Sequence, residues 1–212
     1  MSDLIETIAK LRVVPTVLID DPASAEPLAT AMRGGGVPCA EISIRTPAAL
    51  EAIQIMATMP DMLVGAGSVT NEQELSAAVA AGARFIVTPG LDADLVSSAQ
   101  KHGIPIIPGA VTPTEVMLAQ RIGLRLLKFF PCTVFGGLEA LEEMAAPFPE
   151  MKFLPTGGLN IESLHAYLAL RNVAACGGNW MVKKEWIDSQ AWHYVTLACQ
   201  QTVERIRLQR RQ

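Results

Sequence analysis

The sequence contains few aromatic residues, few cysteines and no excess of positive charge. Aromatic residues make up 5% of the 212 residues although 50% are hydrophobic, so alanine and the aliphatic residues must fill the core. The net charge of −4 at pH 7 argues against a nucleic-acid partner. The cysteines are far apart and show no C-x-x-C spacing, which favours a reduced, intracellular protein over a disulfide scaffold. They are Cys39, Cys132, Cys176 and Cys199.

Long apolar runs are also absent. No stretch approaches the roughly 18 apolar residues that span a bilayer, and the start MSDLIETIAK has no basic region followed by an apolar core, as a secretory signal would. We therefore expect a cytoplasmic protein without a membrane partner. The three histidines, His102, His165 and His193, fall in segments of helix or loop character. A catalytic metal needs His and carboxylate ligands that converge on one site, so we expect no metal.

Short apolar segments recur along the chain, and each is followed by an alanine- and leucine-rich segment of helical pattern. Eight such segments are spaced roughly 20 to 26 residues apart, which is the length of one β-α unit. Because they are almost continuously apolar, they predict a parallel sheet that helices cover on both faces. They begin at Val13, Cys39, Leu63, Phe85, Pro105, Leu126, Lys152 and Val173.

This repetition, without a linker or a low-complexity segment, predicts an α/β fold: a closed (β/α)8 TIM barrel in a single domain, residues 1–212. The first ten residues are expected to form an extra helix at the lower end of the barrel. An open, doubly wound sheet is the main alternative. It is expected to carry a glycine fingerprint after the first strand, which VLIDDPAS lacks. In a barrel, the active site lies where the strands run into the following helices.

The connections after the strands carry helix-start signals. Thr46 and Pro47 in TPAALE predict an N-cap and a first helical residue. The segments TNEQ, from Thr70, and TPTE, from Thr112, both match the capping box. In that motif a hydroxyl group and a Glu or Gln side chain bind the free amides at a helix start.

The segment LRLLKFFPC, residues 124–132, places Lys128 at the centre of an apolar strand. In an apolar pocket the charged form of a lysine is disfavoured, and the neutral amine can attack a ketone to form a Schiff base. Leu126 and Phe130, two residues to either side, should flank Lys128 on the same face. A lysine that extends into solvent at the barrel mouth is the alternative, but the neighbouring apolar residues leave it little room.

The segment AEISIRT alternates polar and apolar residues. Glu41, Ser43 and Arg45 share one face of the predicted strand. Since the isoleucines on the other face should pack under helices, the charged face points into the barrel, where charges are costly unless they are paired or used. A structural ion pair is the alternative to a catalytic role. The lysine on another inward-facing strand favours catalysis.

Two glycine pairs end the seventh and eighth predicted strands, in PTGGLN and ACGGNW. Glycine lets backbone amides approach an anion closely, and the phosphate site of many (β/α)8 barrels lies after strands seven and eight. The two pairs therefore predict a site for phosphate or a similar anion, in preference to simple turns. They are Gly157, Gly158, Gly177 and Gly178.

Two further residues lie at predicted strand ends. Ser68 in GAGSV can donate a hydrogen bond to a bound carboxylate. Pro89 in TPG is expected mainly to shape the backbone beside the substrate.

Taken together, these segments resemble a known family. AEISIRT, GAGSV, TPG, LLKFFP, PTGG and CGGNW occur in the order and spacing seen in bacterial 2-keto-3-deoxy-6-phosphogluconate aldolases, also known as 4-hydroxy-2-oxoglutarate aldolases. The resemblance runs from about Ile8 to the C-terminal helix. It implies a class I aldolase, a carbon–carbon lyase that needs neither a metal nor another cofactor. It also implies a homotrimer that acts in the Entner–Doudoroff pathway of carbohydrate metabolism.

By this resemblance, Lys128 is the Schiff-base lysine and Glu41 is the acid/base carboxylate. Arg45 and Ser68 are expected to hold the carboxylate of pyruvate, and Thr156 is expected beside the bound keto acid. The amides of the two glycine pairs are expected to bind the phosphate of a small-molecule keto acid.

The chain differs from the family pattern at two of these positions. Threonine is usual where Ser68 stands, so the hydroxyl is kept and a methyl group is lost. Serine is usual after the last glycine pair, where this chain has Asn179. The Asn179 amide can also donate to phosphate, but it is larger than a serine side chain.

The expected reaction is cleavage of 2-keto-3-deoxy-6-phosphogluconate to pyruvate and glyceraldehyde 3-phosphate through a lysine Schiff base. Cleavage of 4-hydroxy-2-oxoglutarate to pyruvate and glyoxylate is expected as a second activity, and the preference between the two substrates stays open. Two other functions also stay open. One is a phosphosugar isomerase or epimerase that uses Glu41 as its base, and the other is a non-catalytic sugar-phosphate sensor.

Overall fold

The structure is a computed structural model that describes residues 2–209. Five of its strands begin at the residues predicted from the sequence, and β4, β5 and β8 begin one to three residues later. The strands are β1 Val13–Val17, β2 Cys39–Ser43, β3 Leu63–Gly67, β4 Ile86–Val87, β5 Ile106–Ile107, β6 Leu126–Phe129, β7 Lys152–Pro155 and β8 Cys176–Gly178. The helices are α1 Ser2–Leu11, α2 Ala25–Gly34, α3 Ala49–Ala57, α4 Glu72–Ala80, α5 Ala93–Lys101, α6 Pro113–Arg121, α7 Gly137–Ala145, α8 Leu164–Ala169, α9 Lys184–Asp188 and α10 Trp192–Gln209. Short 3-10 turns lie at η1 Pro22–Ser24 and η2 Thr133–Phe135.

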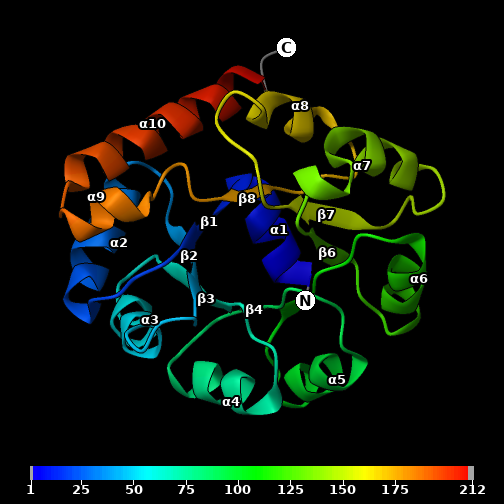
Figure 1. The fold of residues 1–212 in the computed structure, drawn as a ribbon, viewed down its shortest axis with the longest axis horizontal. Helices are drawn as coiled ribbons and strands as arrows, with labels where there is room; N and C mark the ends of the chain where they lie inside the picture. The colour runs from blue at the N-terminus through cyan, green and yellow to red at the C-terminus, as the bar shows by residue number, and fades with distance from the viewer. Residues whose placement is uncertain (1, 210–212) are drawn as a thin grey trace.

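The prediction of a closed, eight-stranded barrel is wrong. The strands form a six-stranded parallel sheet, in the order β5-β4-β3-β2-β1-β8, and a separate two-stranded sheet, β6-β7. Among the described residues, only isolated bridges join the two sheets, at Gly109↔Lys128, Phe153↔Val173 and Thr156↔Gly177. The strands therefore form an incomplete ring, with the outer helices arranged around them (Figure 1).

Proline and short strands account for the two interruptions. β5 has only two residues, and Pro108 and Gly109 follow it directly. On the other side of the small sheet, β7 ends at Pro155, and β8 does not begin until Cys176. Since proline has no N–H to donate to a ladder, pairing stops or is reduced to single bridges at these points.

Helix α1 forms at the start of the chain and lies across the middle of the ring of helices in Figure 1. Its Ile8 is fully buried in an inner apolar cluster that includes Val14, Phe85 and Leu126. Leu63 also packs against this cluster. Leu126 is the first residue of β6 and Leu63 is the first residue of β3, so α1 covers the end of the ring at which the strands begin. The opposite end, where the strands run into the following helices, is left for a functional site.

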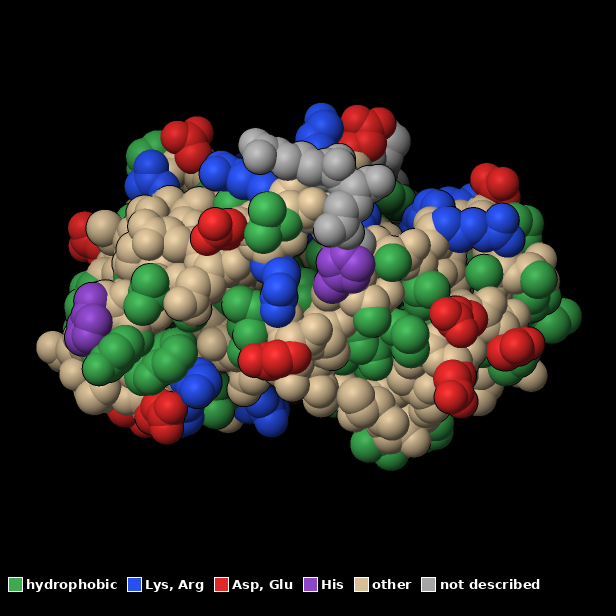
Figure 2. Space-filling model, turned by 90° about the horizontal axis from the view of Figure 1, so that it is seen from above, with side chains coloured by type: hydrophobic (Ala, Val, Ile, Leu, Met, Phe, Trp, Pro, Cys, Tyr) green, Lys and Arg blue, Asp and Glu red, His purple; other side chains and the backbone are tan. Residues whose placement is uncertain are grey.

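The described surface carries charges of both signs. Figure 2 shows Lys and Arg side chains scattered among Asp and Glu side chains, with apolar side chains between them. No helix within residues 2–209 is long and apolar enough to cross a membrane.

The predicted helix starts have three different outcomes. The capping box at Thr112 is confirmed, because the Thr112 side chain accepts from the backbone of Glu115 and the Glu115 side chain reaches back to Thr112. The cap of α4 lies one residue later than Thr70, at Asn71. The cap predicted at Thr46 is wrong, since α3 begins only at Ala49. Residues 44–48 instead form the turn that carries Arg45.

Candidate active site

A buried ion pair joins the two sheets. Nζ of Lys128, on β6, donates to Oε1 of Glu41, on β2, at 2.9 Å. Lys128 is 5% exposed and Glu41 is 0% exposed. The Phe130 ring lies 5.0 Å from the ammonium nitrogen and forms a cation–π contact. Burying two charges has a large desolvation cost, so a pair of this kind contributes little to stability by itself. The pair instead places an amine and a carboxylate in direct contact at the cavity.

A glycine makes room for the carboxylate. A Cβ atom at Gly67, on β3, would overlap the carboxylate group of Glu41. The second carboxylate oxygen, Oε2, is buried and has no hydrogen-bond partner among the described residues. An unpartnered buried acceptor costs about 1–3 kcal/mol. Glu41 therefore keeps one oxygen free to accept a proton or a hydrogen bond from a bound molecule.

A chain of hydrogen bonds links Arg45 to Ser68. The Arg45 Nε donates to Ser43 Oγ at 2.9 Å, and Ser43 Oγ lies 2.8 Å from Ser68 Oγ. Ser43 is fully buried, whereas the Arg45 side chain is exposed at the rim. The backbone φ of Ser68 is 62°, in the left-handed region that non-glycine residues seldom adopt. These bonds and this bend place a guanidinium and a hydroxyl on one side of the site, where they can bind a carboxylate together.

The first glycine pair forms the opposite side of the site. Gly157 and Gly158 have φ values of 99° and 83°, which favour glycine. A Cβ atom at Gly158 would also overlap the side chain of Thr133. The chain can therefore turn tightly after β7, next to the buried Thr156.

Most of the predicted site residues line one cavity of about 370 Å³. These residues are Glu41, Arg45, Ser68, Lys128, Thr156, Gly157, Gly158, Gly178 and Asn179.

Two predicted site residues do not line this cavity. Gly177 forms a bridge with Thr156, and a Cβ atom there would overlap the Thr156 side chain, so its small size allows β7 and β8 to approach. Pro89 lies exposed after β4, and its carbonyl group packs closely against Gly109.

Several residues of the site were given no binding or catalytic role from the sequence. Gly67 makes room for the Glu41 carboxylate, and Ser43 accepts a hydrogen bond from Arg45. Gly67 and Ser43 both lie in segments that the sequence analysis had selected. Thr16 is the one polar residue in VVPTVLI, which is the signal that could have identified it. Lys184 follows the last strand and has no such signal. The further lining residues are Thr16, Val17, Leu18, Leu159, Val182 and Lys184, together with Phe130, which the sequence predicted beside Lys128.

No group of three or more His, Cys, Asp or Glu side chains within residues 2–209 is placed to hold a metal ion. The chemical groups that the cavity does offer are an amine, a carboxylate, a guanidinium, hydroxyls and glycine amides. This set can form an imine, move protons and bind anions at two separate ends.

Comparison with known proteins places this chain in a family. The family model described as "KDPG and KHG aldolase" matches residues 4–198. A 2-dehydro-3-deoxy-phosphogluconate aldolase of Dickeya dadantii is 42% identical over 192 residues, which cover 90% of each protein.

Solved structures agree with this match. The KDPG aldolase of Legionella pneumophila, with pyruvate captured as a covalent carbinolamine intermediate, superposes with a TM-score of 0.90 at 38% identity. The match covers 92% of this chain and 96% of that one. The 2-keto-3-deoxy-6-phosphogluconate aldolase of Zymomonas mobilis, with 3-phosphoglycerate, gives a TM-score of 0.88 at 39% identity and covers 93% and 94% of the two chains. The chain therefore belongs to the family of KDPG and KHG aldolases.

Proposed function

We propose that this protein is a class I aldolase that cleaves 2-keto-3-deoxy-6-phosphogluconate to pyruvate and glyceraldehyde 3-phosphate. The observation that carries the proposal is the buried contact of 2.9 Å between Lys128 Nζ and Glu41 Oε1 at the cavity. The L. pneumophila relative, in which pyruvate is held as a covalent carbinolamine, supports the same chemistry here.

The reaction starts when Lys128 transfers a proton to Glu41 and its neutral amine attacks the C2 ketone. The proton on Glu41 then assists the loss of water, which leaves a protonated imine. The Glu41 carboxylate, ionised again, takes the proton of the C4 hydroxyl, and the electrons of the C3–C4 bond move toward the imine to give an enamine. Glyceraldehyde 3-phosphate leaves at this step. Glu41 then gives this proton to C3 of the enamine, and addition of water to the imine releases pyruvate and restores the amine.

The two ends of the cavity hold the two ends of the substrate. Arg45 and Ser68 bind the carboxylate next to the ketone and fix it relative to the amine, with Thr156 beside them. The phosphate binds to the amides of Gly157, Gly158 and Gly178 and to the side chain of Asn179. The Z. mobilis relative with 3-phosphoglycerate supports a site for a phosphorylated acid.

The same cavity can bind a second substrate. The family name includes KHG, so cleavage of 4-hydroxy-2-oxoglutarate to pyruvate and glyoxylate is the expected second activity.

We further propose a cytoplasmic homotrimer that acts in the Entner–Doudoroff pathway. The exposed apolar side chains of Val134 and Phe135, just after β6, favour a contact between subunits.

Reductive trapping tests the Schiff base. The protein is incubated with pyruvate and borohydride, and the mass of the intact protein is measured by mass spectrometry. We expect the mass to increase by one reduced pyruvyl group in the wild-type protein and to stay unchanged in Lys128→Ala. Glu41→Gln should still fold but turn over the phosphorylated keto acid roughly 10²- to 10⁴-fold more slowly. An isomerase or epimerase on this fold would gain no pyruvyl group, and a sugar-phosphate sensor would release no pyruvate from the keto acid. An adduct that persists in Lys128→Ala would also refute the assignment.

A further inference from the structure

One charged residue of the cavity has no role in the mechanism above. The charged side chains that line the cavity, among residues 2–209, are Glu41, Arg45, Lys128 and Lys184. Glu41 and Lys128 pair with each other, and Arg45 is bound to Ser43 on the carboxylate side. Lys184 is left as the cation that lines the cavity together with Gly178 and Asn179, at the end expected to bind phosphate.

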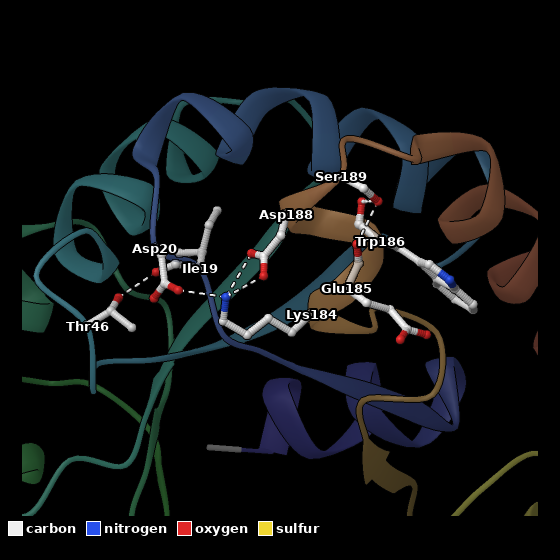
Figure 3. Close-up of polar contacts among 8 residues, drawn as sticks. All are labelled: Ile19, Asp20, Thr46, Lys184, Glu185, Trp186, Asp188 and Ser189. Carbon is white, nitrogen blue, oxygen red and sulfur yellow. Dashed lines mark hydrogen bonds and ion pairs between the residues drawn. The ribbon is translucent and has the colours of Figure 1, made fainter.

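Two aspartates hold the Lys184 ammonium. Its Nζ lies 2.6 Å from Oδ2 of Asp20, in the loop after β1, and 2.8 and 2.7 Å from the two carboxylate oxygens of Asp188, at the end of α9. Figure 3 shows the Lys184 side chain extending from α9 so that its ammonium lies between the two carboxylates. The hydrogen bonds to Asp188 and to Asp20 raise the pKa of Lys184, so the side chain stays charged at neutral pH.

The contact with Asp20 is easy to exchange. The side chains of Lys184 and Asp20 are 39% and 54% exposed, and ion pairs that are exposed to this extent are weak because solvent screens them. Asp188 lies four residues along the same helix, whereas Asp20 comes from a separate loop. A phosphate group carries a charge of about −1.5 to −2 and three acceptor oxygens. It is therefore a stronger partner for the ammonium than a single exposed carboxylate.

We propose that Lys184 binds the distal phosphate of the substrate and that Asp20 competes with this phosphate for the same ammonium. The inference rests on the proposed function, because it takes the ligand of the cavity to be a phosphorylated keto acid. Lys184 then adds a full charge to the glycine amides and the Asn179 side chain, and Asp20 holds the ammonium until the phosphate replaces it.

A pair of variants separates this role from a structural one. Lys184→Met removes the cation and should raise KM for the phosphorylated keto acid about tenfold, the usual effect of losing a charged hydrogen bond near the surface. Asp20→Asn removes the competitor and should lower the same KM by about two- to threefold. If the contact only held the loop to α9, both variants would break it and change KM in the same direction. Lys184→Arg keeps the charge and should restore most of the affinity.

The same keto acid without its phosphate is the matched control substrate. Its KM should be unchanged by either variant, because its remaining charge lies at the Arg45 end of the cavity. Titration calorimetry with inorganic phosphate gives a second measurement that does not depend on turnover, and Lys184→Met should weaken this binding while Asp20→Asn strengthens it. Equal changes for both substrates, or shifts of the same sign in both variants, would overturn the proposal. A third outcome is that Lys184→Met weakens and Asp20→Asn strengthens phosphate binding, but the wild-type protein forms no adduct with pyruvate and borohydride. That outcome would uphold the role of Lys184 and refute the aldolase assignment.

Discussion

The charged groups of the site depend on the size of the residues next to them, as two glycines of β3 illustrate. A Cβ atom at Gly67 would overlap the Glu41 carboxylate, which lines the cavity. A Cβ atom at Gly65 would overlap the ring of Phe85, in the inner apolar cluster. Gly67 therefore makes room for a carboxylate at the cavity and Gly65 makes room for a ring in the core, although they lie two residues apart on one strand.

Gly67→Ala is expected to lower kcat by about 10²-fold, the lower range for a misplaced acid/base group. The added methyl group must push the Glu41 carboxylate away from Lys128, but the carboxylate can move into the cavity, so the fold should be kept. Gly65→Ala is the matched control. Its methyl group has to displace a buried ring, which should lower the free energy of unfolding by about 1–3 kcal/mol. Steady-state kinetics and urea denaturation measure the two effects. Unchanged turnover in Gly67→Ala would show that Glu41 does not need this space.

Among the secondary-structure elements, helix α6 has the most complete start signal. The Thr112 side chain and the Glu115 carboxylate bind backbone amides at the first turn, and Glu115 also accepts from the backbone of Val111. Burial raises the pKa of Glu115, but the hydrogen bonds from Val111 and Thr112 outweigh it, so the net shift is downward. A lowered pKa in the folded state means that the ionised carboxylate stabilises the fold.

Glu115→Gln should therefore lower the free energy of unfolding at pH 7. The Glu115 contribution is fully present above the unfolded pKa of about 4.3. It is lost as the pH falls through the lower, folded pKa, because the wild-type side chain then becomes neutral as well. Urea denaturation of both proteins across this range measures the difference, which should shrink toward low pH. Glu142→Gln, on the exposed face of α7, is the control for the same loss of charge. A difference that stays constant with pH would contradict the assignment.

At the level of the whole molecule, the two apolar clusters enclose every cysteine. Cys132, Cys176 and Cys199 belong to the outer cluster, between the strands and the helices, and Cys39 belongs to the inner one. All four thiols are free and buried. Burial raises the pKa of each of them, to about 12 for Cys199. The thiolate, which is the reactive form, is therefore scarce and inaccessible in the folded protein.

Thiol labelling should consequently report the opening of the whole molecule. In native conditions, reaction with a thiol reagent such as iodoacetamide is expected to be slower than in denaturant by several orders of magnitude, because it requires unfolding. Mass spectrometry of partly labelled samples should show mainly unlabelled and fully labelled protein. Rapid labelling of a single cysteine in the native protein would show that one side of the ring opens on its own.

Much of the site could be predicted because it follows from local pattern. Strand side chains alternate faces, so the apolar neighbours of Lys128 and the alternation around Glu41 are enough to place both side chains inside. The glycine pair at Gly157 is recognisable because its backbone conformation excludes most other residues. The order of strands and helices follows from the same local rules, and so do five of the strand starts.

Only the tertiary structure decided whether the ring of strands closes and which distant segments meet. Ladder continuity depends on the alignment of separate strands, and Pro108 and Pro155 interrupt it in ways that no single segment reveals. The bonds from Lys128 to Glu41 and from Lys184 to Asp20 join residues far apart in the chain. Alternation predicts which face a side chain occupies, but the partner that it meets there depends on how the other segments pack.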